Sequence, residues 1–327
     1  MKISSMKEIT APVAEHIEKF DPYMRGQLKS RAALLDTVIR YIVRQRGKRV
    51  RPLLVFLASG ACGQITERTY IGATMVELLH TATLVHDDVV DGADERRGVA
   101  SINAVWKNKV AVLVGDYLLS KGLLIAVHNN EFDFLRVTSE AVRRMSEGEL
   151  LQIQKSKQRT LDEETYFRII SDKTASLIST CCEVGAIAAT DDANVRSTLR
   201  NYGELVGLAF QIRDDVLDYT SRSSILGKPV GNDIREGKIT LPLLMAAQNA
   251  PKQQAASMIK LVKGKSGKRK DADTVIRFVT EHRGIELAQA KASSLQQQAV
   301  DSLVILPESP YRKALVDFAN FVVDRTS

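Results

Sequence analysis

The chain has 327 residues, of which 44% are apolar and 26% are charged, and its formal net charge is +7. This apolar content is sufficient for a large buried core. The mild charge, with basic residues scattered among acidic ones and no recognised binding motif, argues against a nucleic-acid-binding protein. The three cysteines form neither an even disulfide framework nor a metal-binding spacing, so we expect a protein of the reducing cytoplasm.

Residues 1–20 are charged throughout and lack the apolar centre of a signal peptide. No charge-free run approaches the ~18 residues that a membrane span needs. The longest such run, residues 52–66, is interrupted by two glycines. We therefore expect a soluble protein without a transmembrane segment.

Apolar residues recur three and four positions apart through most of the chain, which predicts helices. The clearest stretches are residues 34–42, 110–128, 202–216 and 315–322. Alternating patterns typical of strands are nearly absent, and no proline- or glycine-rich linker divides the chain. We predict an all-α fold that forms one domain over residues 1–327. Six lysines and arginines between Lys260 and Lys270 indicate a long surface loop, whose role the sequence leaves open.

An acidic motif ends one of the apolar helices. Asp87, Asp88 and Asp91 form an Asp-Asp-x-x-Asp sequence. On a helix, residues three and four apart share a face, so Asp87 and Asp91 lie on one stripe with His80. Carboxylates this close repel one another unless a cation lies between them. A solvated acidic helix end is the alternative explanation.

A second copy of the motif, Asp214, Asp215 and Asp218, ends another apolar helix, with Gln211 one turn before it. Two copies, each at the end of an apolar helix, are hard to explain as solvated helix ends. Together they predict a metal site. Magnesium fits best, because it prefers oxygen ligands and combines a few carboxylates with water and phosphate oxygens.

A basic element, Gly-Lys-Arg-x-Arg-Pro, supplies Lys48, Arg49 and Arg51 directly before an apolar helix. Proline suits the first turn of a helix and helix N-termini attract anions, so these cations could hold a diphosphate. An ordinary basic helix start explains the element equally well. Arg96 and Arg97 follow the first acidic motif, either as bidentate phosphate donors or as parts of a structural network with carboxylates.

Two further segments place polar residues within reach of a ligand. Lys173 and Thr174 open an otherwise apolar segment, although a single lysine there could mark only a helix boundary. Residues 227–240 contain several glycines together with Lys228 and Lys238, which is typical of a mobile lid.

Combined, these features predict an apolar helical cavity with six aspartates at its mouth and cations around them. This charge pattern fits a substrate diphosphate bridged to carboxylates by Mg²⁺, and the apolar helices indicate hydrocarbon for the rest of the substrate. Ionisation of an allylic diphosphate needs this arrangement. Metals and cations stabilise the departing anion, while a dry pocket protects the carbocation.

In chain order stand Gly-Lys-Arg-x-Arg-Pro, the first acidic motif, Arg-Arg-Gly, Lys-Thr, the second acidic motif and Gly-Lys-Pro-x-Gly-Asn-Asp. With these motifs the sequence resembles the all-trans polyprenyl diphosphate synthases over almost its whole length. The resemblance implies an all-α isoprenoid synthase bundle around a central apolar cavity, usually a homodimer. It implies head-to-tail condensation of isopentenyl diphosphate onto an allylic diphosphate such as farnesyl diphosphate. It further implies Mg²⁺, with three ions per active site, and transient membrane contact during product release.

The resemblance also implies roles by position. The metal ligands would be Asp87, Asp88, Asp91, Asp214 and Asp215, with Asp218 as a weaker or water-mediated contributor. Isopentenyl diphosphate would be held by Lys48, Arg51, His80 and Arg97, with Arg49 assisting. The allylic diphosphate would be held by Arg96, Lys173, Thr174, Gln211, Lys228 and Lys238. Lys173 and the aspartates other than Asp218 would carry the catalysis. Where many members have proline two residues after Arg-Arg-Gly, this chain has Ala100, which affects the local loop shape alone.

Product length depends in this family on residues behind the first acidic motif. Ala82, roughly 7.5 Å before Asp87 along the helix axis, and Thr83 are small, whereas short-chain members commonly have an aromatic ring there. Leu79 and Met75 are the next obstacles along the helix. We predict a long product, heptaprenyl to nonaprenyl with octaprenyl the best value. Close helix packing around Ala82 is the alternative explanation of the small residues.

Other functions are less favoured by the sequence. A terpene cyclase shares a metal-bound acidic motif but holds one diphosphate, so residues 47–52 and Arg97 argue against it. A non-catalytic subunit of a heteromeric synthase typically has eroded acidic motifs, and both are intact here. A shorter-chain farnesyl or geranylgeranyl diphosphate synthase is the alternative for product length.

Overall fold

The computed structural model describes residues 5–30, 32–44, 49–96, 98–157, 162–220, 231–264 and 269–325. Within these ranges the chain is helical almost throughout. Its one sheet is a hairpin of the two-residue strands β1 (Glu95–Arg96) and β2 (Val99–Ala100). The predicted all-α fold class is confirmed.

The first half of the chain contains α1 (Met6–Thr10), the 3₁₀ turn η1 (Ala11–Val13), α2 (Ala14–Gln27), α3 (Ala33–Arg44), α4 (Val50–Cys62), α5 (Glu67–Val90), α6 (Ile102–His128) and α7 (Phe132–Lys157). The second half contains α8 (Glu163–Ile170), the π-helical turn η2 (Ser171–Ala175), α9 (Ser176–Ala189), α10 (Ala193–Thr220), α11 (Asn232–Arg235), α12 (Leu241–Asn249), α13 (Lys252–Lys263), α14 (Arg269–Glu281), α15 (Gly284–Ser302), the 3₁₀ turn η3 (Leu303–Ile305) and α16 (Pro310–Asp324).

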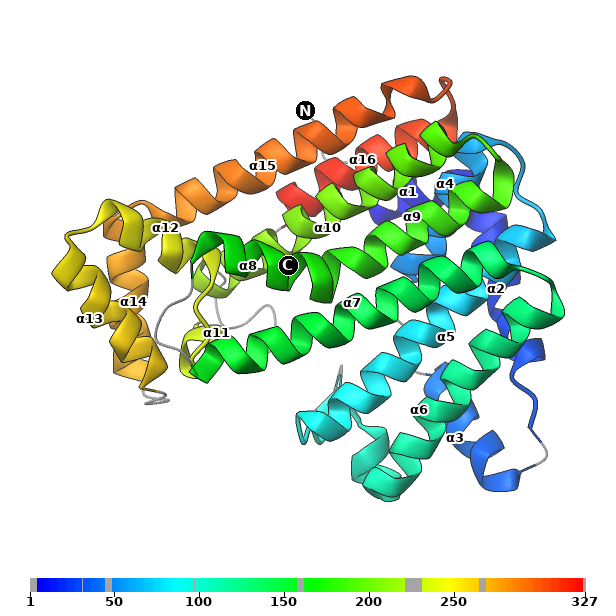
Figure 1. The fold of residues 1–327 in the computed structure, drawn as a ribbon, viewed down its shortest axis with the longest axis horizontal. Coiled ribbons are helices and arrows are strands. Elements are labelled where there is room, and N and C mark those ends of the chain that lie inside the picture. Colours follow the sequence, from blue (N-terminus) through cyan, green and yellow to red (C-terminus); the bar gives the residue numbers. More distant parts are fainter. Residues whose placement is uncertain are drawn as a thin grey trace.

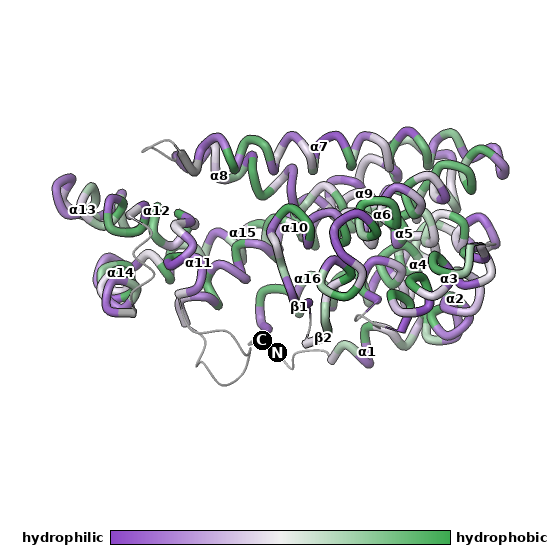
Figure 2. Tube along the Cα trace, turned by 90° about the horizontal axis from the view of Figure 1, so that it is seen from below, coloured by the Kyte–Doolittle hydropathy of each residue, from purple (hydrophilic) through white to green (hydrophobic). Residues whose placement is uncertain are grey.

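The long helices form a bundle that encloses α9. This helix packs against α4, α5, α7 and α10, and α6 lies along α5 (Figure 1). α16 returns the end of the chain to α4 and α1. The helices α12, α13 and α14 gather at the far end of the molecule from α2 and α3, and α15 joins this group to the bundle (Figures 1 and 2).

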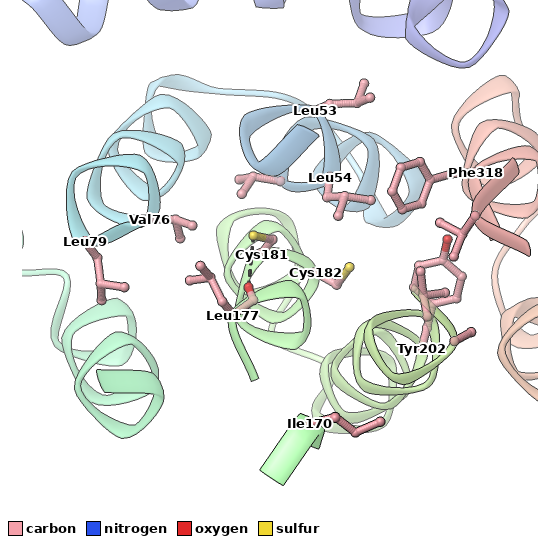
Figure 3. Packing of buried hydrophobic residues seen from close by; sticks show 14 of the residues in the cluster. Leu53, Leu54, Val76, Leu79, Ile170, Leu177, Cys181, Cys182, Tyr202 and Phe318 are labelled. Atoms are coloured by element: carbon pink, nitrogen blue, oxygen red, sulfur yellow. Dashed lines mark hydrogen bonds between the residues drawn. The ribbon is translucent and has the colours of Figure 1, made fainter. Parts of the chain in front are cut away.

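α9 lies at the centre because its side chains are apolar or small around nearly the whole helix. Cys181 and Cys182 are fully buried in this core, beside Leu54 of α4 and Tyr202 of α10 (Figure 3). Burial raises the pKa of the Cys181 thiol to about 12, so the thiol stays protonated at neutral pH. The two cysteines therefore pack as core residues and are not nucleophiles.

The backbones of α4 and α9 touch directly at Gly185. A Cβ atom at this position would lie 2.4 Å from the carbonyl oxygen of Val55. Glycine is therefore required there, because any side chain would separate the two central helices. The close contact fixes α4, which carries the predicted basic element at its start, relative to the centre of the bundle.

α6 is apolar around most of its circumference. Within the described ranges it is the one helix long and apolar enough to cross a membrane, although core helices of soluble proteins pass the same test. α6 contains no long charge-free run, because Asp116 and Lys121 interrupt its apolar stretch. Leu118 is buried against the bundle, whereas Leu113 and Leu124 are about half exposed. One face of α6 is therefore left uncovered by this chain.

Candidate active site

A cavity of about 1130 Å³ opens among α4, α5, α7 and η2. Its walls are mostly apolar, with contributions from α2, α3, α6 and α16. The predicted site residues that line it are Arg49, Arg51, His80, Thr83, Asp87, Asp88, Arg96, Lys173 and Thr174. The fold thus gathers four separate sequence motifs around one space. Lys48, Arg97 and Lys228 lie outside the described residues.

The last turn of α5 presents the first acidic motif. Asp87 and Asp88 line the cavity, while Asp91 caps the helix and is exposed. Burial raises the pKa of Asp87 above its usual range, and Glu149 and Asp91 add to the shift, although Lys173 opposes it. Burial thus disfavours the charged form of this carboxyl group, and a nearby cation favours it.

Asp88 is buried and is neutralised by an arginine from the neighbouring hairpin. Arg96 Nε donates to Asp88 Oδ1 over 2.6 Å. Gly98, with a φ of +74°, turns the hairpin back toward α5. Arg96 also lines the cavity. The two predictions for Arg96, a carboxylate partner and a phosphate donor, are therefore compatible in this geometry.

None of the three aspartates of the second acidic motif lines the cavity, so of the six predicted at its mouth only Asp87 and Asp88 do. Asp215 is buried and accepts hydrogen bonds from the Tyr166 hydroxyl at 2.6 Å and from Gln211 Nε2 at 2.9 Å. Burial raises the pKa of Asp215 to about 7, even though both hydrogen bonds favour the charged form. Asp214 pairs with Arg325 at 2.5 Å, at the end of α16.

Asp218 is directed toward the start of α11 and does not line the cavity. It accepts the backbone N–H groups of Asn232 and Asp233, each over 3.1 Å. Burial raises the pKa of Asp218 to about 6. Lys238, predicted for the allylic diphosphate, pairs here with Asp233 at 3.2 Å and with Glu236, and it also lies away from the cavity lining.

Lys173 and Thr174 lie on the π-helical turn η2 and both line the cavity. Lys173 forms an ion pair with Glu149 of α7. Glu149 lines the cavity as well. Thr174 Oγ1 donates to Gln211 Oε1 over 2.9 Å, and Gln211 in turn holds Asp215. One hydrogen-bonded chain therefore links η2 to the second acidic motif.

The basic element begins α4 on the opposite side of the cavity. Arg49 adopts a left-handed conformation, with a φ of +51°, and pairs with Asp21 at 2.9 Å and with Glu77 at 2.5 Å. These internal pairs fix its guanidinium group. Arg51 and the buried His80 line the cavity beside it.

The residues predicted to control product length divide into two groups. Thr83 lines the cavity. Ala82 is fully buried and does not line the cavity. Leu79 and Met75 do not line it either, and only a few per cent of their surface is exposed. The prediction that Ala82 opens a tunnel does not hold in this structure, because neighbouring helices pack against it. Adjacent helical residues point about 100° apart, so Thr83 faces the cavity while Ala82 faces the core.

Two residues with a direct part in the site were missed by the sequence analysis. Tyr166 and Arg325 are the partners of Asp215 and Asp214, but they lie 49 and 111 positions away along the chain. Neither belongs to a local motif, so no signal in the sequence identifies them.

In the parts of the chain that the structure describes, no three acidic, histidine or cysteine side chains are close enough to hold an ion by themselves. This suits Mg²⁺, which takes one or two carboxylates and completes its shell with water and phosphate oxygens. Asp87 and Asp91, one turn apart, provide such a pair. The donor set therefore fits an ion that binds together with a diphosphate.

The family model "Polyprenyl synthetase" matches residues 32–279. The chain belongs to the polyprenyl synthetase family. It is 38% identical to the octaprenyl diphosphate synthase of Haemophilus influenzae, over 99% of this chain and 98% of the relative. It is also 38% identical to the all-trans-nonaprenyl-diphosphate synthase (geranyl-diphosphate specific) of Rhodobacter capsulatus, over 99% of each chain.

Solved structures of family members have the same fold. The polyprenyl synthase of Caulobacter crescentus, complexed with calcium and isoprenyl diphosphate, superposes with a TM-score of 0.90 at 32% identity and full coverage of both chains. A geranylgeranyl pyrophosphate synthetase of Pyrococcus horikoshii gives 0.89 at 31% identity, over 98% of this chain and 99% of that one. The predicted isoprenoid synthase fold is confirmed.

The enzyme class and the reaction class are confirmed as well. Polyprenyl synthetases are prenyltransferases that condense isopentenyl diphosphate onto an allylic diphosphate with the help of a divalent metal. Isoprenyl diphosphates are accordingly the substrates of this synthase, as the sequence predicted.

We expect Asp215→Asn to stabilise the metal-free synthase more at pH 8 than at pH 5. The raised pKa means that the folded state binds this proton more tightly than the unfolded state, whose value is near 3.8. The resulting stability is present at low pH and is lost as the pH rises through about 7. Thermal unfolding in EDTA should show a melting temperature at least ~2 °C higher for the variant at pH 8. A similar difference at both pH values would contradict the buried-charge explanation.

Proposed function

We propose that this synthase extends an allylic diphosphate such as farnesyl diphosphate to a long all-trans polyprenyl diphosphate, with octaprenyl the favoured product. One observation carries the proposal: a single apolar cavity is lined by charged residues from two sets of segments, the start of α4 with the middle of α5, and the end of α5 with β1 and η2. The first group is Arg49, Arg51 and His80, and the second is Asp87, Asp88, Arg96 and Lys173. Two diphosphates need two such groups, whereas a terpene cyclase needs one.

In this proposal the second group receives the allylic substrate. Arg96, Lys173, Thr174 and Gln211 hold its diphosphate, with Lys228 and Lys238 closing over it. Asp87, Asp88, Asp91, Asp214 and Asp215 hold Mg²⁺, with Asp218 assisting, and three ions would neutralise the charge that develops on the departing diphosphate. Lys173 adds a fixed positive charge beside Asp87 that further stabilises this anion.

The first group orients isopentenyl diphosphate. Lys48, Arg49, Arg51, His80 and Arg97 hold its diphosphate so that its double bond faces the allylic carbon. The carbon–oxygen bond of the allylic substrate breaks, the double bond attacks the resulting cation, and a proton leaves to the departing diphosphate. The apolar walls exclude water, which would otherwise capture the cation.

The long product is supported by the relatives and by the wall of the cavity. Relatives at 38% and 35% identity are named octaprenyl diphosphate synthases. The cavity is lined by Thr83 of α5, which carries Asp87, by Leu118 and Leu119 of α6, and by Val142 of α7. None of these four side chains is aromatic; the aromatic residues of the lining come from α10 and α16.

The exposed face of α6 supports a homodimer. Val112, Leu113, Leu124 and Val127 are uncovered there, and Phe132 continues the surface at the start of α7. Contiguous apolar surface of this kind is typical of an interface, and a two-fold axis would place the same face of two chains together. Burial in a dimer also explains the apolar composition of α6 without a membrane span.

We further propose that the helical unit, residues 1–327, acts as one domain in the cytoplasm. Contact with a membrane would be transient and limited to release of the apolar product.

The carboxylates can be tested by activity. Asp87→Ala should lower turnover by at least ~10²-fold, because a carboxylate that acts in the transition state is lost. Turnover should be assayed with isopentenyl diphosphate, farnesyl diphosphate and Mg²⁺, and the fold checked by circular dichroism. Asp36→Ala is the matched control, since Asp36 pairs with Arg40 at the protein surface. Near-normal turnover of a folded Asp87→Ala variant would refute the assignment.

Product length can be tested at the cavity wall. Thr83→Tyr should shorten the products while the first condensation persists, because the ring would fill the space behind Asp87. Thr83→Val keeps the side-chain volume and should leave the length unchanged. Chromatography of the dephosphorylated products measures both. Wild-type products no longer than geranylgeranyl, with excess isopentenyl diphosphate, would refute the long-chain proposal.

The dimer can be tested by light scattering. Leu113→Glu should convert a wild-type dimer into a monomer, because it buries a charge at the interface. A wild-type monomer that becomes active only with a second polypeptide would favour a heteromeric enzyme, a possibility raised by the 34% identity to component 2 of the Bacillus subtilis heptaprenyl diphosphate synthase.

A further inference from the structure

The turn η2 interrupts an otherwise continuous helix from α8 to α9 with π-helical hydrogen bonding. π-helical turns are rare because they pack the backbone less favourably than α-helix, and they occur mostly at functional sites. This turn carries Lys173 and Thr174, both of which line the cavity. Some interaction must therefore stabilise the turn against relaxation to a regular helix, which would redirect both side chains.

Two glycines hold the backbone of η2 between its neighbours. A Cβ atom at Gly148 of α7 would lie 2.8 Å from Asp172 Cβ, and one at Gly207 of α10 would lie 2.5 Å from Ala175 Cα. The turn thus touches the backbones of α7 and α10 directly. These contacts fix its position but not the direction of its first residues.

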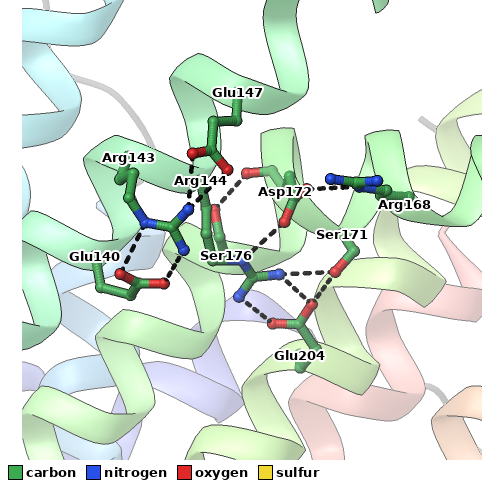
Figure 4. Close-up of polar contacts among 9 residues, drawn as sticks. All are labelled: Glu140, Arg143, Arg144, Glu147, Arg168, Ser171, Asp172, Ser176 and Glu204. Atoms are coloured by element: carbon green, nitrogen blue, oxygen red, sulfur yellow. Dashed lines mark hydrogen bonds and ion pairs between the residues drawn. The ribbon is translucent and has the colours of Figure 1, made fainter. Parts of the chain in front are cut away.

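Arg144 of α7 binds the start of the turn and α10 at the same time (Figure 4). Its Nε donates to Asp172 Oδ1 over 2.9 Å, and its Nη2 donates to Ser171 Oγ over 2.7 Å. Nη1 and Nη2 reach the two carboxylate oxygens of Glu204 at 3.1 and 2.9 Å. Ser171 Oγ donates to Glu204 Oε1 over 2.5 Å, which closes the network.

The network is largely shielded from water. The side chains of Arg144, Asp172 and Glu204 are 19%, 17% and 23% exposed. Ion pairs with multiple hydrogen bonds in such surroundings are stronger than exposed ones, and loss of the cation leaves two carboxylates unpaired. Asp172 directly precedes Lys173, so the network holds the backbone next to the catalytic lysine.

The adjacent Arg143 provides a natural contrast. It pairs with Glu140 and Glu147 on its own helix, and all three side chains are about half exposed (Figure 4). It does not contact η2. Both arginines belong to α7 and each forms two ion pairs, but of the two only Arg144 pairs with a residue of the turn.

We propose that Arg144 is a positioning residue. Together with Asp172, Ser171 and Glu204 it maintains the π-helical turn, so that Lys173 and Thr174 point into the cavity, and it does so without contacting substrate. The effect on catalysis rests on the proposed role of Lys173 and Thr174 at the allylic diphosphate.

The test compares Arg144→Ala with Arg143→Ala in the full-length enzyme. For Arg144→Ala we expect kcat/KM for the allylic substrate to fall roughly 10- to 100-fold, as small misplacements of catalytic groups do, while KM for isopentenyl diphosphate stays unchanged. Backbone amides of residues 171–176 should exchange hydrogen faster, and those of α4 should not. Arg143→Ala should resemble wild type in every measurement. Arg144→Lys should be intermediate, because an ammonium group keeps the charge but lacks the planar fork with which the guanidinium group binds several acceptors at once.

Three outcomes would overturn the proposal. The first is normal kinetics and exchange for Arg144→Ala. The second is a rise in KM for isopentenyl diphosphate as large as that for the allylic substrate. The third is faster hydrogen exchange across the whole bundle. If Arg144→Ala does not fold, Ser171→Ala removes hydrogen bonds of the network without changing its charge, and the same comparison then decides. Lys173→Ala distinguishes failure of the proposed role of Lys173 from failure of the proposed role of Arg144. If it leaves allylic kinetics intact, the role of Lys173 fails, while the exchange measurement still tests whether Arg144 maintains the turn.

Discussion

The pairing of the site's carboxylates with internal donors makes this active site possible. Asp88 is neutralised by Arg96 and Asp214 by Arg325, while Asp215 is held by neutral donors and keeps a raised pKa of about 7. Without these partners, aspartates at the mouth of an apolar cavity would repel one another. The cavity can therefore keep carboxylates ready for metal and diphosphate at a tolerable cost in stability.

The same pairs connect the acidic motifs to the rest of the fold. Gln211 links Asp215 to Thr174 on η2, and η2 is bound to α7 and α10 through Arg144. Contiguous polar contacts thereby link the second acidic motif to η2, α7 and α10. The central helix α9 supplies the rigid backing, because its small and apolar residues let α4, α7 and α10 approach closely.

The proposed dimer and the proposed product length both depend on α6. Its buried face contributes Leu118 and Leu119 to the cavity wall, while Leu113 and Leu124 on the other side remain exposed. In these proposals one helix would meet the growing hydrocarbon on one side and a second subunit on the other. These two apolar contacts would explain why the composition of α6 resembles that of a membrane-spanning helix.

The sequence by itself determined the helical fold class, the acidic stripes and the ordered motifs, because helical periodicity and local spacing fix which neighbours share a face. Only the tertiary structure decided that Thr83 faces the cavity and Ala82 the core, since that depends on how α5 is rotated against its neighbours. Likewise the partners of Asp214 and Asp215, the π-helical form of η2 and the uncovered face of α6 come from segments far apart in sequence. Such long-range contacts leave no local pattern, because they are fixed by the packing of whole helices and not by residue spacing.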